Sequence, residues 1–226
     1  MPVQAADRQW SVVSSAEDLC PKPGDDLISL MLEAAQRARF IDLVGLASRM
    51  ATARQRDWLS CWPGEHYRLL AGLVDILQPT TVIEIGTGQG IGALSLADRL
   101  PSGGRVVTYD VIPWTEIAES VLRPEDFSSG RIEQRLGDLS DPGTFERELP
   151  VLRGAELIFA DASKDGIFES ALLKMLLPAL VDSRRLLFLD DIRLLKMLQV
   201  WRDLPLAKLD ATSVGHWSGT GLAFTV

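Results

Sequence analysis

The stretch that most constrains the fold of this chain is residues 80–92, T-T-V-I-E-I-G-T-G-Q-G-I-G. Its β-branched first half predicts a short strand that carries the carboxylate of Glu84, and Gly86, Gly88 and Gly90 follow directly. Glycines at this spacing let the backbone turn sharply and approach a ligand, and the helix expected next offers unpaired N–H groups. We therefore predict a nucleotide-type binding turn, with a purely structural turn as the alternative.

Strand and helix patterns alternate from this turn to the end of the chain. Such alternation predicts an α/β fold with a mostly parallel sheet covered by helices on both faces, so that ligands bind beyond the carboxyl ends of the strands. Residues 166–180 give the clearest helical pattern. Strands are predicted at residues 82–85, 105–109, 131–136, 157–160 and 186–189.

The two ends of the chain differ from this alternating middle. Residues 1–24 show no period and are interpreted as an arm or loop, and helical spacings follow up to residue 77, including residues 41–50. Near the C-terminus, too few residues separate the strand-like segments 206–214 and 221–226 to form a crossover helix. These two segments are therefore predicted to pair as an antiparallel hairpin.

Composition restricts the class of protein further. Apolar residues make up 46% of the 226 residues, which indicates a packed globular core, and the net charge of −8 argues against a nucleic-acid partner. The cysteines, Cys20 and Cys61, match neither a disulfide framework nor a metal motif and are expected to be free thiols. Because the N-terminus lacks a signal-peptide pattern and no apolar run approaches ~20 residues, we expect a cytoplasmic protein without a membrane partner.

Carboxylates recur at the predicted strand ends. Asp161 and the pair Asp190 and Asp191 follow two apolar strands, so parallel pairing would bring them to one edge of the sheet. Converging carboxylates repel one another unless a hard divalent cation neutralises them. The alternative is capping, in which Asp191 starts a helix over residues 192–198 and Asp161 ends its strand.

Lys164 follows Asp161 by three residues and is placed to reach the same edge. A nearby cation would disfavour its ammonium form and make it a base, whereas the carboxylates act in the opposite direction. The alternative is an ordinary solvated loop lysine.

Four motifs together resemble a known family. E-I-G-T-G-Q-G, followed by T-Y-D, resembles the class I S-adenosylmethionine-dependent methyltransferases. F-A-D-A-S-K and F-L-D-D are similar to the metal-dependent branch that includes catechol and caffeoyl-coenzyme A O-methyltransferases. The resemblance covers residues 67–226 and implies a Rossmann-like, doubly wound, seven-stranded sheet whose last strand is antiparallel. It implies a single domain, with residues 1–78 as arm and helices and residues 79–226 as the cofactor-binding core.

The resemblance also implies roles for individual residues. The expected cofactor is S-adenosylmethionine and the expected metal is Mg²⁺, with Lys164 as the general base. Glu84, Gly86, Gly88 and Gly90 would line the methionine side of the cofactor. Asp110 and Val111 would contact its ribose, and Asp138 its adenine. Asp161 would contact the cofactor and would also bind the metal, together with Asp190 and Asp191.

This sequence departs from the family pattern at Asp191, at Ser163, and in the segments W-P-G-E-H-Y and G-H-W-S-G-T-G. Asp191 stands where the family usually has asparagine, and Ser163 stands where catechol-type enzymes have a bulky aromatic, so we expect Trp114 or Ile112 to pack on the adenine. In the loop between the last strands, His216 and Trp217 either face the acceptor pocket, as a second base and an aromatic wall, or belong to an ordinary hairpin. His66 is a weaker candidate for the site.

The expected activity is in-line transfer of the cofactor's methyl group to a hydroxyl of a small molecule, with a metal lowering the hydroxyl's pKa. The alternatives are a metal-independent methyltransferase with His216 as base, and a cofactor-binding protein without methyl transfer. A nicotinamide-dependent oxidoreductase is disfavoured, because its fingerprint does not require an acid such as Glu84 before the glycines. The helices ahead of the core are expected to serve as a lid or as the surface of a homodimer.

Overall fold

The computed structural model describes residues 21–225, so most of the predicted arm, together with Cys20, lies outside the described residues. The core is a seven-stranded sheet with the order β3-β2-β1-β4-β5-β7-β6. Its strands are β1 (Thr81–Ile85), β2 (Arg105–Asp110), β3 (Ile132–Leu136), β4 (Leu157–Ala160), β5 (Leu186–Asp190), β6 (Lys208–Asp210) and β7 (Thr220–Phe224).

The first five strands are parallel, and β7 pairs antiparallel with both β5 and β6. This arrangement confirms the predicted doubly wound sheet and its antiparallel end. The central strands β1, β4 and β5 are almost continuously buried, which is typical of parallel strands covered on both faces. Their carboxyl ends meet at one edge of the sheet, as β1 is flanked by β2 and β4, and β4 by β5.

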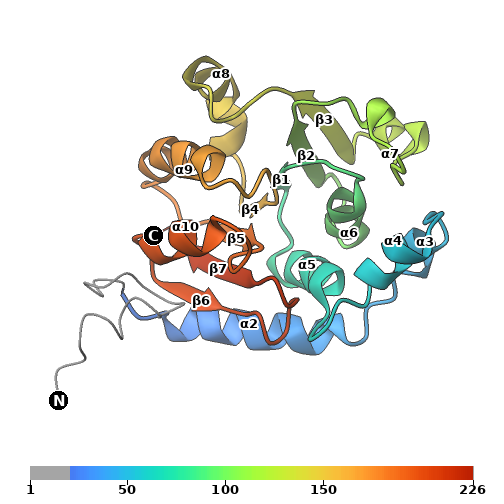
Figure 1. The fold of residues 1–226 in the computed structure, drawn as a ribbon, viewed down its shortest axis with the longest axis horizontal. Coiled ribbons are helices and arrows are strands. Elements are labelled where there is room, and N and C mark those ends of the chain that lie inside the picture. Colours follow the sequence, from blue (N-terminus) through green and yellow to red (C-terminus); the bar gives the residue numbers. More distant parts are fainter. Residues whose placement is uncertain (1–20, 226) are drawn as a thin grey trace.

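Helices cover both faces of the sheet (Figure 1). The helices α2 (Asp25–Ala38), α5 (His66–Leu77) and α6 (Ile91–Asp98) share one apolar cluster with alternate strand residues such as Val82 and Phe159. The intervening strand residues, such as Ile83 and Ile158, pack on the opposite face. That face is covered by α8 (Pro142–Arg153), α9 (Ile167–Ala179) and α10 (Met197–Asp203).

A smaller apolar cluster lies beside α5 and α6. It is built around Leu46, Leu59 and Ile91 and joins the short helices α3 (Val44–Ala47) and α4 (Ala53–Trp58) to the first face. No helix among residues 21–225 is both long enough and apolar enough to cross a lipid bilayer. The remaining short elements are η1 (Trp114–Glu116) and α7 (Pro124–Ser128).

Two predicted elements are shorter than expected, and a third is displaced along the chain. Residues 41–50 form only the single turn α3, and the helix predicted at residues 192–198 begins only at Met197, so Asp191 does not cap it. The segment predicted as strand over residues 206–214 is strand only at Lys208–Asp210. There the Asp210 side chain accepts hydrogen bonds from the backbone and side chain of Thr212, at 3.0 and 2.5 Å, and this local turn ends the strand.

Candidate active site

The glycine turn joins β1 to α6 and brings the ends of three strands together. The backbone N–H groups of Gly86 and Thr87 both donate to the carbonyl oxygen of Tyr109, at 2.8 and 3.1 Å. Gly86 has a φ of 101°, and a Cβ atom there would lie 1.9 Å from the carbonyl oxygen of Asp161. Because only glycine fits this approach, the turn holds the ends of β1, β2 and β4 against one another.

Asp110, at the end of β2, is fixed beside this turn. One carboxylate oxygen accepts from the N–H of Gly88 at 3.0 Å, and the other accepts from the N–H of Ile112 at 3.1 Å. Gly90, with a φ of 86°, then starts α6. The carboxylate of Asp110 is thus oriented by backbone groups alone.

Two adjoining cavities open at this edge of the sheet. One of about 580 Å³ lies beyond β1, β2 and β4, and the other, of about 570 Å³, reaches from the glycine turn to the loop that precedes β7. The predicted residues that line the first cavity are Gly86, Gly88, Asp110, Val111, Asp138 and Asp161. Those that line the second cavity are Glu84, Gly86, Gly88, Gly90, Asp161, Asp190, Asp191 and His216. Gly86, Gly88 and Asp161 line both cavities.

The aromatic side chain in the first cavity differs from the expectation. Trp114 stacks on Phe127 with ring centroids 5.1 Å apart, and neither Trp114 nor Ile112 lines the cavity. Phe168, in the first turn of α9, lines it instead. The expectation of Trp114 or Ile112 relied on closeness in sequence to Asp110, whereas Phe168 reaches the cavity from the helix that follows β4.

Glu84 is a buried carboxylate near the carboxyl end of β1. It accepts a hydrogen bond from the Thr108 hydroxyl at 2.5 Å, and that hydroxyl lies 2.8 Å from the hydroxyl of Thr87. Among residues 21–225, no cation forms an ion pair with Glu84. Burial raises the pKa of Glu84 well above its usual value, and a positively charged ligand at this end of the cavity would favour its ionised form.

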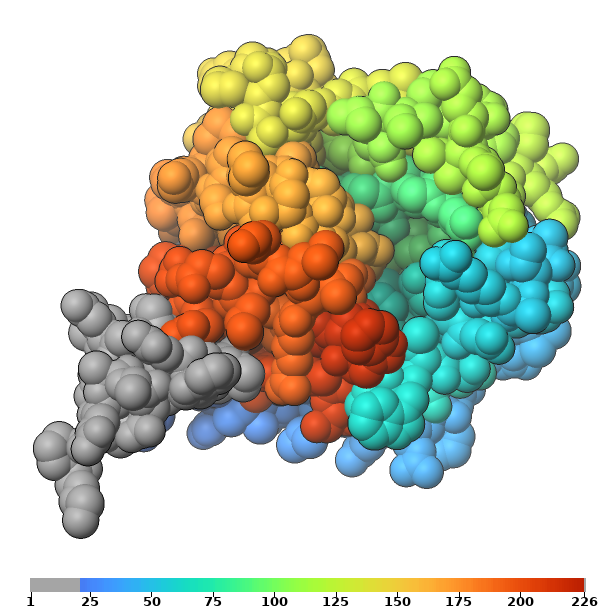
Figure 2. All heavy atoms as spheres, viewed as in Figure 1, coloured from blue at the N-terminus to red at the C-terminus, as the bar shows by residue number. Residues whose placement is uncertain are grey.

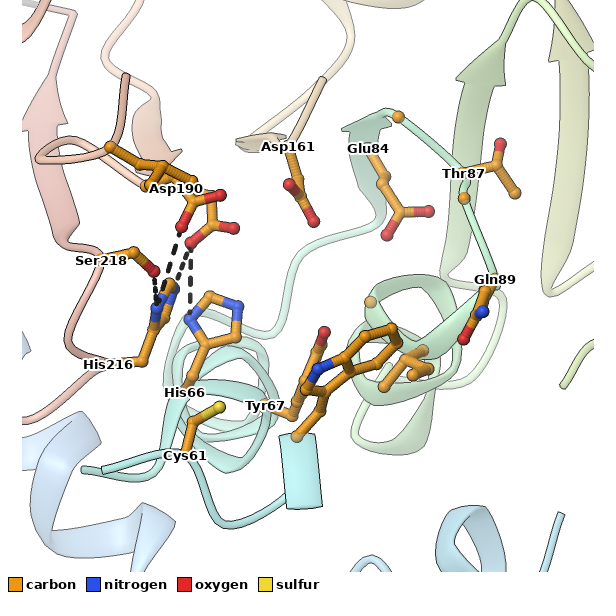
Figure 3. Close-up of a pocket in the computed structure, with 18 of the residues that line it drawn as sticks. Cys61, His66, Tyr67, Glu84, Thr87, Gln89, Asp161, Asp190, His216 and Ser218 are labelled. Atoms are coloured by element: carbon orange, nitrogen blue, oxygen red, sulfur yellow. Dashed lines mark hydrogen bonds and ion pairs between the residues drawn. The ribbon is translucent and has the colours of Figure 1, made fainter. Parts of the chain in front are cut away.

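The strand ends of β4 and β5 bring the predicted carboxylates together. Asp161, Asp190 and Asp191 each offer an oxygen atom, and these atoms lie within 4.8 Å of one another. Figure 3 shows Glu84, Asp161 and Asp190 directed into the same space. We call Asp161, Asp190 and Asp191 the carboxylate cluster; its all-oxygen donor set is of the kind that binds hard divalent cations.

Lys164 is buried against the carboxylate cluster rather than solvated. Its Nζ atom lies 2.8 Å from Asp161, 3.6 Å from Asp190 and 3.5 Å from Asp191. Burial alone would lower the pKa of Lys164, but the three carboxylates together raise it above its ordinary value. In the ligand-free protein Lys164 is therefore an ammonium ion.

His216 is also part of the site, and not an ordinary hairpin residue. It is buried, with Nε2 2.6 Å from Asp190 Oδ1 and Nδ1 2.6 Å from the Ser218 hydroxyl. Burial lowers the pKa of His216, but the hydrogen bond and charge of Asp190 raise it above the ordinary value. Trp217, next in the chain, is 60% exposed and lines the second cavity.

His66, which was only a weak candidate from the sequence, lies at the same place. It opens α5, is 4% exposed, and has Nδ1 3.8 Å from Asp190 Oδ1. Its ring meets that of His216 edge-on, with centroids 4.3 Å apart. Burial lowers the pKa of His66 to about 3, so it is neutral.

The outer wall of the second cavity comes from the segment before α5 and the loop before β7. Glu65 N donates to Val214 O at 3.1 Å, and Trp217 N donates to Trp62 O at 2.9 Å. Figure 2 shows the resulting hollow between the cyan N-terminal helices, the green strands and the orange-red C-terminal part. Arg54, Trp58, Cys61, Tyr67 and Trp217 line this wall.

A doubly wound sheet with an antiparallel last strand, a glycine turn and acidic strand ends defines a Rossmann-like, nucleotide-cofactor type of α/β protein. Within that class, the chain belongs to the O-methyltransferase family, whose family model matches residues 48–192, more than half of the chain.

Individual relatives agree with this assignment. A transmembrane O-methyltransferase from Propithecus coquereli is 33% identical over 87 residues, which are 38% of this chain and 30% of the relative. This chain thus aligns with under a third of the curated relative's length. Two solved structures share the fold over most of both chains.

Cofactor-bound Rv0187 from MTB superposes with a TM-score of 0.52 and 22% identity, covering 89% of this chain and 90% of that one. A Staphylococcus aureus protein assigned as a caffeoyl-CoA O-methyltransferase superposes with a TM-score of 0.59 and 13% identity, covering 87% and 99%. At these identities the likeness concerns the fold alone.

Proposed function

We propose that this chain transfers the methyl group of S-adenosylmethionine to a hydroxyl of a small molecule, with a divalent metal, Mg²⁺, at the carboxylate cluster. The observation that carries the proposal is the junction of the two cavities at Gly86, Gly88 and Asp161. A donor in the first cavity and an acceptor in the second would meet beside the carboxylate cluster. Such alignment of the two reactants supplies a large part of catalysis in a transfer reaction.

The residues of the first cavity suit the proposed cofactor. Asp110 is held by two backbone N–H groups and retains lone pairs that can accept the ribose hydroxyls. Glu84, which lines the adjoining second cavity, offers a buried carboxyl group whose ionised form the positively charged methionine end would stabilise. Phe168 offers an aromatic face for the adenine, and Asp138 lines the same cavity. The cofactor, when bound, supplies a methyl group already activated by its sulfonium.

The carboxylate cluster suits a hard cation, since all of its donors are carboxylate oxygens. A divalent cation there would polarise an acceptor hydroxyl and neutralise the carboxylates that now raise the pKa of Lys164. We assign proton acceptance to Lys164, which lies 2.8 Å from Asp161. The wall that carries Arg54, Trp58 and Trp217 suits an aromatic acceptor.

The experiment is methyl transfer from tritiated cofactor to a panel of phenols, catechols and aliphatic alcohols, with and without EDTA. We expect turnover that EDTA abolishes and Mg²⁺ restores, and that Asp191→Ala and Lys164→Ala each lower at least about 100-fold. Cofactor binding without transfer to any acceptor would instead favour a cofactor-binding protein that does not methylate.

A second candidate is a metal-independent methyltransferase that uses His216 as base. It is favoured by the hydrogen bond between His216 Nε2 and Asp190 Oδ1, since a carboxylate that orients an imidazole is a common feature of histidine bases. Turnover that survives EDTA and Lys164→Ala, but not His216→Gln, would select it. Calorimetry with S-adenosylhomocysteine and Mg²⁺ separates the candidates as well. Only the first candidate expects Mg²⁺ to bind to the carboxylate cluster.

A further inference from the structure

Asp190 presents its two carboxylate oxygens to different neighbours. Oδ2 faces Lys164 at 3.6 Å, within the carboxylate cluster. Oδ1 lies 2.6 Å from His216 Nε2 and 3.8 Å from His66 Nδ1. The two imidazole nitrogens and a carboxylate oxygen of Asp190 lie within 4.8 Å of one another, so they form a second group of possible ligands (Figure 3).

The spacing of this second group suits a transition metal. Bonds of about 2.1 Å from a metal to nitrogen and oxygen ligands place neighbouring ligand atoms roughly 3 to 3.5 Å apart. The observed 2.6 and 3.8 Å lie on either side of that separation. Small rotations of His66 and His216 would therefore complete the geometry without movement of the backbone.

His66 adds an independent observation. Its side chain is 4% exposed, and Nδ1 has no hydrogen-bond partner among the described residues. A buried nitrogen without a partner is costly, and such atoms in folded proteins often mark the place of a ligand. Nδ1 is directed at Asp190, where a cation would satisfy both groups.

Ser218 orients the other imidazole. Its hydroxyl lies 2.6 Å from His216 Nδ1, so with a cation in place of the Nε2 proton that now bonds to Asp190, an Nδ1–H would donate to the hydroxyl and the Nε2 lone pair would be free for the cation. Histidines that bind metals commonly use their second ring nitrogen in this way. His216 and Ser218 are both buried, which limits the motion of the ring.

We infer that His66, His216 and Asp190 form a second cation site, which shares only Asp190 with the carboxylate cluster and takes a borderline transition metal such as Zn²⁺, Fe²⁺ or Co²⁺. Imidazole nitrogens select these ions, whereas Mg²⁺ prefers the all-oxygen cluster. All three ligands line the second cavity, so the remaining coordination positions are open to a small oxygen ligand. The inference does not depend on methyl transfer.

The test is Co²⁺ binding to the tag-free full chain in excess Mg²⁺, followed by visible absorption and equilibrium dialysis. We expect one equivalent of Co²⁺ that Mg²⁺ does not displace. His66→Gln and His216→Gln should each weaken its binding at least about 100-fold, and Ser218→Ala by about 10- to 100-fold. Asp191→Ala is the matched control, which should lose Mg²⁺ and retain Co²⁺.

Displacement of Co²⁺ by Mg²⁺, or equal Co²⁺ affinity in the wild type and in both histidine variants, would overturn the inference. Loss of Co²⁺ from Cys61→Ser would also contradict it, because that thiol lines the same cavity and would then be the ligand. Circular dichroism of each metal-free variant verifies folding. His216→Gln keeps the test decisive if the buried His66 cannot be replaced.

Discussion

At the scale of single residues, Glu84 illustrates a conflict between stability and ligand binding. The carboxylate is 1% exposed and receives one hydrogen bond, from Thr108, but no cation among the described residues forms an ion pair with it. A charge in such a place destabilises the ligand-free fold and becomes favourable when a cationic ligand arrives. When Glu84 is replaced by a neutral residue, we therefore expect the stability of the ligand-free fold to rise and the affinity for a cationic ligand to fall.

Glu84→Gln should stabilise the ligand-free protein at pH 8 by about 1 to 3 kcal/mol, the usual cost of an unsatisfied buried polar group. The folded-state pKa of this acid is raised, so its stability contribution is greatest at low pH and is lost as the pH rises above the unfolded value of 4.5. The increase in the free energy of unfolding that Glu84→Gln produces should therefore become smaller as the pH falls toward 5. Thermal melting across pH, with calorimetry of S-adenosylhomocysteine binding, tests both trends.

A variant that is stabilised equally at pH 5 and pH 8 would show that charge is not the cause. A variant with unchanged cofactor affinity would remove Glu84 from the cofactor site.

Two glycines of the turn provide a matched pair. Gly86→Ala places a methyl group 1.9 Å from the Asp161 carbonyl, whereas a Cβ at Gly88 meets nothing within 4 Å. We expect Gly86→Ala to unfold the protein or lower its melting temperature sharply. Gly88→Ala should cost only about 1 to 2 kcal/mol of left-handed backbone strain and weaken cofactor binding. Melting curves that cannot distinguish the two variants would contradict this account of the turn.

The sequence predicted some of the site residues for a clear physical reason. Apolar strands such as residues 157–160 and 186–189 are recognisable by themselves, and parallel pairing then brings the following Asp161, Asp190 and Asp191 to one edge. Phe168 was not predicted and His66 was only a weak candidate, because both reach the site through helices and crossovers whose packing no local pattern encodes. The spacing of residues along the sequence also does not reveal the hydrogen bond between His216 Nε2 and Asp190, which lie 26 residues apart.

At the scale of elements, the segment before α5 and the loop before β7 stabilise each other and form one wall. Trp62 and Trp217 lie in these two segments and are joined by a backbone hydrogen bond of 2.9 Å. Both indoles are exposed, but only Trp217 lines the cavity. Substituting each tryptophan in turn therefore distinguishes a side-chain contact with the acceptor from a role in holding the wall together.

Trp217→Ala should raise the KM for an aromatic acceptor by about 2- to 10-fold, the value of one aromatic contact, and leave the cofactor KM unchanged. Trp62→Ala, which keeps the backbone hydrogen bond to Trp217, should change neither. Steady-state kinetics with each substrate varied in turn makes the comparison. Equal effects of the two substitutions would assign Trp217 to the structure of the wall alone.

Element boundaries were predicted less well than element types. The hairpin of β6 and β7 was expected from a gap too short for a helix, and the structure confirms it. Strand β6 is nonetheless short, because Asp210 turns the chain by bonding to Thr212. Such side-chain hydrogen bonds compete with the strand ladder and are invisible to an apolar pattern.

At the scale of the whole molecule, the sheet brings residues that are far apart in the sequence together at one edge, where the ligand binds. Residues from β1, β2 and β4, up to Asp161, surround the first cavity, and the helices of both faces hold these strands in register. A ligand that bridges several strand ends binds only the folded chain. Cofactor binding should therefore stabilise the whole fold rather than one loop.

At 100 times its dissociation constant, S-adenosylhomocysteine should add about 2.7 kcal/mol to the stability of the fold. For a chain of this size, that corresponds to a rise in melting temperature of about 5 to 10 °C. Asp110→Ala should reduce the rise at the same ligand concentration, because it removes the carboxylate at the end of β2 that lines the first cavity. Asp98→Ala, at an exposed position outside both cavities, should retain the full rise. A scan of ligand concentration distinguishes weakened binding, in which the rise returns at higher concentration, from a misfolded variant, in which it does not. A full rise in Asp110→Ala would show that Asp110 does not bind the cofactor.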